Sequence, residues 1–101
     1  MTTNYRRGYA LERRTRLELE ADGYRVIRSA GSKGPADLVA WCEELVRFVQ
    51  VKSGKSPLSR AERERLEEIP LPVMSRVEVW TWERHGRGLK PKVEVLSFRA
   101  L

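Results

Sequence analysis

The 101-residue chain has very few of the residues that build several common kinds of site. It contains one cysteine, Cys42, and one histidine, His85. One cysteine excludes an internal disulfide and any zinc site made of several cysteines, and we expect a reducing, cytoplasmic setting. Because the chain has only one histidine, no second histidine can share a metal ion with it, and we expect His85 to be an exposed turn residue.

Long apolar runs are also missing. No stretch is long enough to span a membrane, and none reads as a signal peptide, so we expect no membrane association. The length predicts one domain over residues 1–101, with a basic N-terminal arm at residues 1–8. A domain of this size has a modest core, so self-association would add to its stability.

Positive charge is plentiful. The formal net charge is +6 and the isoelectric point is near 10.0. Such a surface favours a polyanionic partner, although RNA-binding and ribosomal proteins are equally basic. Charge therefore predicts a nucleic-acid partner but no particular reaction.

Two apolar stretches in the middle of the chain carry polar residues at one end. Residues 36–41 (ADLVAW) and 45–52 (LVRFVQVK) are rich in β-branched and aromatic residues, which predicts an antiparallel pair of strands. A two-residue turn between them places Asp37 opposite Gln50, on the same face as Lys52. A turn one residue longer would move Gln50 to the other face.

A carboxylate, an amide oxygen and a lysine at one sheet edge can support metal-assisted hydrolysis of a phosphodiester. Oxygen ligands suit a hard cation such as magnesium, which binds phosphate and activates water. A lysine beside them can stabilise developing negative charge. A purely structural explanation is also open, in which Asp37 begins a strand and Lys52 extends to solvent.

The sequence of this region resembles a known nuclease family. GPADLVA followed by FVQVKSG is similar to the PD-(D/E)xK nuclease core, in which an Asp on one strand precedes Glu-x-Lys on the next. The segment before it, RRGYALERRTRLELEADGYRVIRSAGS, resembles the archaeal-type Holliday-junction resolvases. The shared features are a Gly-x-x-x-Glu-Arg helix start, a helix-ending glycine, a strand ending in Arg-Ser and a loop serine. The resemblance covers about residues 6–66, and the chain departs from it at Gln50, where the family usually has glutamate.

This resemblance implies a metal-dependent endonuclease that uses Mg²⁺ or Mn²⁺ and cuts branched DNA, above all the four-way junction, as a homodimer. A two-fold dimer suits a junction of approximate two-fold symmetry. Another small nuclease of the superfamily, of the virus-type replication-repair class, is an alternative, and so is a degenerate fold that binds DNA or RNA without cutting. The resemblance assigns catalysis to Glu12, Ser32, Asp37, Gln50 and Lys52, with Glu12, Asp37 and Gln50 as metal ligands.

Gln50 raises the question of a second acidic ligand. Some nucleases of the superfamily carry this ligand on the neighbouring helix, where Glu62 is the nearest candidate. Ser59 and Glu62 also form a capping-box pattern, which is enough to explain Glu62. Alternatively Gln50 ligates through its amide oxygen, or catalysis has been lost.

Cations near this region are candidate DNA contacts. They sit on the first helix, at its start, at a strand end or in the two loops, and a solvated basic surface explains them equally well. The candidates are Arg6, Arg7, Arg13, Arg14, Arg28, Lys33 and Lys55.

The pattern of elements predicts an α/β fold of the restriction-endonuclease-like type, with a mixed sheet of about five strands flanked by helices in the order α-β-β-β-α-β-β. A crossover through the second helix makes the fourth strand parallel to the third. Trp80 and Trp82 share one face of that strand. We expect them to cover the second helix, with a dimer face or a base-stacking platform as alternatives. The expected elements are helices at 9–22 and from about 60, and strands at 24–29, 36–41, 45–52, 76–84 and 92–98.

Overall fold

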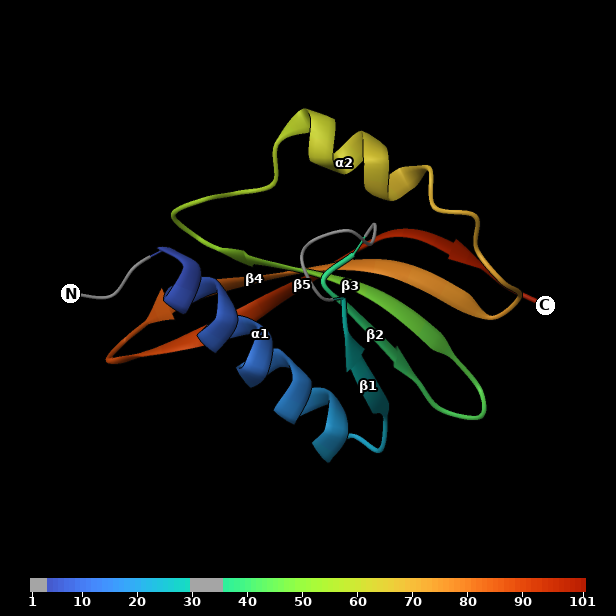
Figure 1. Cartoon of the computed structure of the whole chain (residues 1–101), viewed down its shortest axis with the longest axis horizontal. Helices are drawn as coiled ribbons and strands as arrows, with labels where there is room; N and C mark the ends of the chain where they lie inside the picture. Colours follow the sequence, from blue (N-terminus) through green and yellow to red (C-terminus); the bar gives the residue numbers. More distant parts are fainter. Residues whose placement is uncertain (1–3, 30–35) are drawn as a thin grey trace.

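A five-stranded mixed sheet lies between two helices, one on each face (Figure 1). The computed structural model describes residues 4–29 and 36–101. The predicted α/β class and the order α-β-β-β-α-β-β are confirmed. The elements are α1 (Asn4–Ala21), β1 (Arg25–Arg28), β2 (Leu38–Trp41), β3 (Val46–Ser53), α2 (Arg60–Glu67), β4 (Ser75–His85) and β5 (Gly88–Arg99).

Strand order in the sheet follows the chain. The strands β1, β2 and β3 form an antiparallel meander, β4 runs parallel to β3 after the α2 crossover, and β5 is antiparallel to β4. Leu38 pairs with Val49, so the next residue pair along the ladder places Asp37 opposite Gln50. The two-residue turn on which this register depends is confirmed.

Helix α1 begins earlier than the sequence predicted. It starts at Asn4, so the predicted arm over residues 1–8 is wrong from Asn4 onward, and residues 1–3 lie outside the described part. Gly8 suggested a boundary, but one glycine inside a helix costs only about 1 kcal/mol and does not end it. The predicted end is confirmed, because Gly23 has the left-handed φ of 93° that a helix-terminating glycine adopts.

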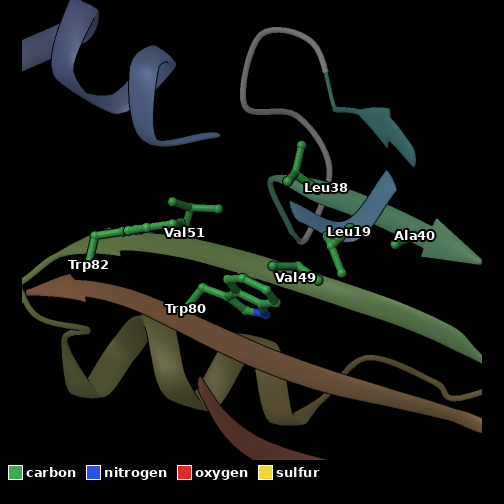
Figure 2. Close-up of a cluster of buried hydrophobic side chains, with 7 residues drawn as sticks. All are labelled: Leu19, Leu38, Ala40, Val49, Val51, Trp80 and Trp82. Carbon is green, nitrogen blue, oxygen red and sulfur yellow. The ribbon is translucent and has the colours of Figure 1, made fainter. Parts of the chain in front are cut away.

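Helix α1 packs on a core that contains both tryptophans of β4. The buried members of this cluster are Leu19, Leu38, Ala40, Val49, Val51, Trp80 and Trp82 (Figure 2). The expectation that Trp80 and Trp82 cover the second helix is therefore wrong. Pairing of Trp80 with Val51 directs these rings to the α1 face, and at 4% and 2% exposure neither offers a free ring face to a base or a partner.

The opposite face of the sheet is covered by α2. Leu66 and Ile69 pack there with Val77 and Val79 of β4 and with Ala36. Because side chains alternate along a strand, Asp37, Gln50 and Lys52 point to this α2 side. The start of α2 therefore sits above the polar end of β2 and β3.

A buried ion pair joins β3 to β4 on the α1 face. The guanidinium of Arg47 donates to both carboxylate oxygens of Glu78, at 2.7 and 2.8 Å, and Trp80 Nε1 donates to the same carboxylate at 2.9 Å. Burial pushes the pKa of Glu78 upward, but the hydrogen bonds from Arg47 and Trp80 outweigh burial and hold it below its ordinary value. A fully satisfied pair of this kind links β3 to β4.

Thr15 links α1 to β4 and provides a test of the core. Its hydroxyl donates to Leu11 O and accepts the indole N–H of Trp82, both at 2.8 Å, at a fully buried position. Replacing Thr15 by Val keeps the shape but leaves the buried N–H without an acceptor, which should cost about 1–3 kcal/mol. Urea denaturation measures the loss, and Thr15→Ser, which keeps the hydroxyl, is the control. Equal stability of Thr15→Val and the wild type would contradict this role.

Candidate active site

Asp37 is fixed at the start of β2 by the backbone of β3. Its Oδ2 accepts the N–H of Val51 at 2.9 Å, which holds the half-buried carboxylate against the middle strand. Burial raises the pKa of Asp37, and the charge of Glu62 adds to the rise, while the Val51 N–H, Lys52 and Arg28 oppose it. The net rise means that nearby positive charge does not fully compensate this carboxylate.

Glu12 brings a second carboxylate to the same place from α1. Its side chain is only 14% exposed, and Arg28 of β1 pairs with it at 3.4 Å. Burial raises the pKa of Glu12, the negative charge of Asp37 raises it further, and Arg28 opposes both. The charge of Asp37 acts on Glu12, so the two carboxylates interact electrostatically, and a shared metal site stays a prediction.

Lys52 and Glu62 complete the cluster on the α2 side. Lys52 Nζ lies 2.6 Å from Glu62 Oε2, and this bond is the main cause that lowers the pKa of Glu62. Glu62 Oε1 accepts the N–H of Ser59 at 3.1 Å, while the Ser59 hydroxyl accepts the N–H of Glu62, so the capping box is confirmed. The two oxygens of Glu62 thus have different partners, one in the helix cap and one in the site.

The remaining sequence candidates divide into three groups. Gln50 is half-buried and lies on the same face as Asp37. Its side-chain amide makes no hydrogen bond with the described residues. Ser32 and Lys33 fall outside the residues that the structure describes, as does the rest of their loop. Arg6 and Arg7 lie in the first two turns of α1 instead of in an arm.

The other cations have definite places. Arg13 and Lys55 are exposed. Arg14 lies over the ring of Trp82, 4.8 Å from its centroid, and donates to Leu89 O at 3.4 Å. Arg28 lies over the ring of Tyr9 at 5.0 Å in addition to its bond with Glu12, so Arg14 and Arg28 also hold the fold together.

Two contacts of this site carry no signal in the sequence. One is the backbone N–H of Val51, because every non-proline residue has this donor and only the register directs it at Asp37. The other is the Tyr9 ring beside Arg28, which depends on where α1 crosses the sheet. The Lys52–Glu62 pair did carry a signal, since the capping box places Glu62 in the first turn of α2.

The donor set fits a hard divalent cation. Glu12, Asp37 and Gln50 offer oxygen atoms, the type that Mg²⁺ and Mn²⁺ prefer, and a cation would relieve the effect of the Asp37 charge on the pKa of Glu12. In the described part of the chain no three His, Cys, Asp or Glu side chains lie close enough together to hold a metal ion. A site with only a few protein ligands is suitable for magnesium, because this ion keeps several of its waters and also binds the substrate phosphate.

The arrangement of the sheet, the helices and the acidic side chains identifies the fold class, and comparison with known families then identifies the family. A mixed sheet with α1 on one face, α2 on the other and acidic side chains at the junction of β2 and β3 is the restriction-endonuclease-like fold. The model of the archaeal Holliday junction resolvase (Hjc) family matches residues 3–71. The chain therefore belongs to the archaeal Holliday junction resolvase family.

Individual relatives agree with this assignment. The crossover junction endodeoxyribonuclease Hjc of Methanocaldococcus jannaschii is 36% identical over 69 residues, which are 68% of this chain and 51% of that protein. The chain thus spans about half the length of this curated relative. The structure of Hjc from Archaeoglobus fulgidus, a Holliday junction resolvase, superposes with a TM-score of 0.63 over 89% of this chain and 73% of that chain. At 24% identity, this likeness supports the fold.

Within residues 4–29 and 36–101, neither helix has the length and apolar character needed to cross a membrane.

The raised pKa of Asp37 has a consequence for stability. The folded chain binds the Asp37 proton more tightly than the unfolded chain does, so the stability linked to this group declines as pH rises through its folded pKa. Asn keeps an acceptor for the Val51 N–H and removes the charge. Asp37→Asn should raise the melting temperature by about 4 °C at pH 7, and the gain should vanish in acid below the ordinary aspartate range.

Thermal melts from pH 3 to pH 8 measure this gain. Glu43→Gln, an exposed acid in the β2–β3 turn, is the control and should show no such pH-dependent gain. A lower melting temperature for Asp37→Asn at pH 7 would contradict the account.

Proposed function

We propose that this chain is a metal-dependent, structure-selective DNA endonuclease that resolves four-way junctions by paired phosphodiester hydrolysis. The observation that carries the proposal is the meeting of Glu12, Asp37, Lys52 and Glu62 at one end of the sheet, in a chain of the resolvase family. Such a substrate places its action in the cytoplasm, where the DNA lies.

Each residue of the site has a distinct task. Asp37 and Glu12 would hold Mg²⁺ or Mn²⁺, with the Gln50 amide oxygen as a further ligand. A cation bound there would supply a positive charge able to polarise the phosphate and activate water. Lys52 is directed at the same place and stabilises the charge that develops on the phosphate oxygens. Ser32 positions the phosphate, and Arg28 orients Glu12 through their ion pair.

Glu62 supplies the negative charge that Gln50 lacks. Its carboxylate contacts Lys52 directly, and its charge raises the pKa of Asp37, so it belongs electrostatically to the cluster. Because Gln50 of β3 is neutral, Glu62 takes over the negative charge: it holds Lys52 in the site and adds affinity for the cation.

Arginines and lysines around the site bind the DNA backbone. Arg13 and Lys55 are exposed and available for phosphate. Arg6, Arg7 and Lys33 remain proposed DNA contacts on the basis of the sequence. Two copies of the chain related by a two-fold axis would present two such sites to the two strands of like polarity in the junction.

One observation favours a second candidate. Gln50 replaces the glutamate that is usual in the family, which reduces the negative charge at the metal site. The alternative is a junction-binding module that keeps the fold and the basic surface but has no cleavage activity.

A cleavage assay separates these two candidates. A labelled four-way junction and a matched linear duplex are incubated with the protein in magnesium, manganese or EDTA. Paired nicks near the junction centre are expected with metal only. Asp37→Asn, which keeps the Val51 hydrogen bond, should reduce the cleavage rate by at least 100-fold, because the metal loses a charged ligand. Binding without cleavage in both metals would favour the binding module.

The role of Glu62 is tested by a charge-neutral replacement. Glu62→Gln keeps the capping box, in which Gln serves as well as Glu, but removes the charge beside Lys52. Cleavage should fall about tenfold or more, with a higher magnesium requirement. Adding Gln50→Glu should restore much of the activity. Glu64→Gln, an exposed acid on the same helix, is the control. Unchanged cleavage in Glu62→Gln would limit Glu62 to the helix cap.

A further inference from the structure

The hairpin between β4 and β5 is strongly basic. Residues 84–92 contain four cations and no acid, and the cations are Arg84, Arg87, Lys90 and Lys92. All four residues are exposed. The hairpin lies outside residues 3–71, which the family model matches, and none of the tasks assigned above uses it. Its charge is therefore a feature that membership of the family does not explain.

The hairpin projects beyond the rest of the sheet. The pairing of β3 with β4 ends at Trp82, whereas β4 and β5 stay paired as far as His85 and Gly88 (Figure 1). A two-residue turn closes the hairpin, and Gly86 supplies the positive φ, 59°, that the first position of such a turn requires. Arg87, the second residue of the turn, is therefore held at the tip of a regular two-stranded ribbon.

A row of paired residues connects the hairpin to the candidate active site. Lys52 of β3 pairs with Thr81 of β4, and Thr81 pairs with Lys92 of β5. Because residues directly opposite each other point to the same side of a sheet, Lys92 lies on the α2 face with Lys52. Neighbouring strands lie about 4.8 Å apart, so the backbone of Lys92 is about 10 Å from that of Lys52. Lys90 lies on the same face, two residues closer to the tip.

The charges of these two hairpin lysines are not taken up by acids of the chain. Within the part of the chain that the structure describes, neither Lys90 nor Lys92 forms an ion pair, although Glu83 is the cross-strand partner of Lys90. Glu94, the next acid along this face, is bonded to Arg63 at 2.8 Å. That bond is the main cause that lowers the pKa of Glu94, and the charge of Lys92 contributes less. Both lysines are therefore available to an external anion.

The phosphate backbone of a DNA duplex matches this surface in charge and in spacing. Arg87, Lys90 and Lys92 form a basic strip that extends about 15 Å along the ribbon, given a rise of about 3.3 Å per strand residue. Each strand of a duplex carries one negative charge per 3.4 Å or so of its axis. The basic strip thus spans several successive phosphates, and it begins one row of the sheet away from Lys52.

We propose that the basic strip binds the phosphate backbone of one duplex arm, within about eight nucleotides of the phosphate at the site. This inference rests on the proposed function, because it needs DNA at Asp37 and Lys52. Contacts with phosphate fix the orientation of a duplex on a protein and carry no sequence information. The basic strip therefore sets the direction in which one arm leaves the branch point and adds affinity without a sequence preference.

Removing two of these charges tests the proposal. Lys90→Gln combined with Lys92→Gln is compared with Arg25→Gln combined with Arg99→Gln, which removes the same charge from exposed positions at the opposite end of the sheet. Each protein is titrated in EDTA with a four-way junction at several salt concentrations. The lysine variant should bind about tenfold more weakly in low salt, and its plot of log K against log salt should be shallower by about 1.8, which is 0.9 for each lost phosphate contact.

The arginine variant should keep the wild-type slope, and Lys90→Arg with Lys92→Arg, which retains both charges, should restore wild-type binding. Equal slopes for the lysine and arginine variants would overturn the proposal. If the lysine variant melts well below the wild type, Arg87→Gln at the tip is held to the same outcomes, with a slope change of about 0.9.

Neutral methylphosphonate linkages locate the contact on the DNA. They replace single phosphates at successive positions along one arm, starting at the branch point. The wild type should lose affinity at positions within about eight nucleotides of the cut phosphate, and the lysine variant should lose nothing further at the positions that its lysines contact. If the two losses multiply at every position, or if no position matters, the basic strip does not contact the arm.

Binding in EDTA separates this proposal from the proposed function. A chain that binds junctions without cutting them still tests the basic strip, whereas a failure of the proposed function appears as absent cleavage in metal. A wild-type protein that binds no junction in EDTA would overturn the basic strip as well.

Discussion

The site depends on one hydrogen bond, from the backbone N–H of Val51 to the carboxylate of Asp37. This bond ties the start of β2 to the middle strand and holds a half-buried acid in place. The β2–β3 register puts Gln50 opposite Asp37, and Lys52 follows on the same face. Burial raises the pKa of Asp37. Burial also raises the pKa of Glu12, and the negative charge of Asp37 raises it further. Two partly buried acids with raised pKa values are costly for the fold at neutral pH, and a divalent cation would relieve that cost.

Because Gln50 is neutral, any further acidic group near the site comes from another element, and the first turn of α2 carries Glu62. Glu62 faces Lys52 with one oxygen and caps its own helix with the other. The helix cap and the ion pair with Lys52 therefore depend on the same side chain. The contact between Lys52 and Glu62 brings the first turn of α2 close to the end of β3. An acid at this place can act on the site without a change in the strand itself.

The sequence predicted the elements and the Asp37–Gln50–Lys52 face because these depend on local patterns: alternation in strands, a short polar turn and a capping box. It failed where the answer depends on tertiary packing. Trp80 and Trp82 were correctly placed on one face, but which helix covers that face depends on how β4 pairs with β3. Gly8 was read as a boundary, although the helix continues through it. The row that joins Lys52 to Lys92 crosses three strands and leaves no pattern in the sequence.

The central claim is that Asp37 and Glu12 hold one divalent cation at the end of the sheet. Anomalous X-ray scattering from crystals soaked in Mn²⁺ tests it most directly, because manganese is located independently of any assumption about its ligands. The account predicts a manganese peak within coordination distance of an oxygen of Asp37, with Glu12 as a direct or water-bridged ligand, and no such peak in crystals of Asp37→Asn. Ordered crystals without manganese at Asp37, or with manganese only at other acidic residues, would contradict it.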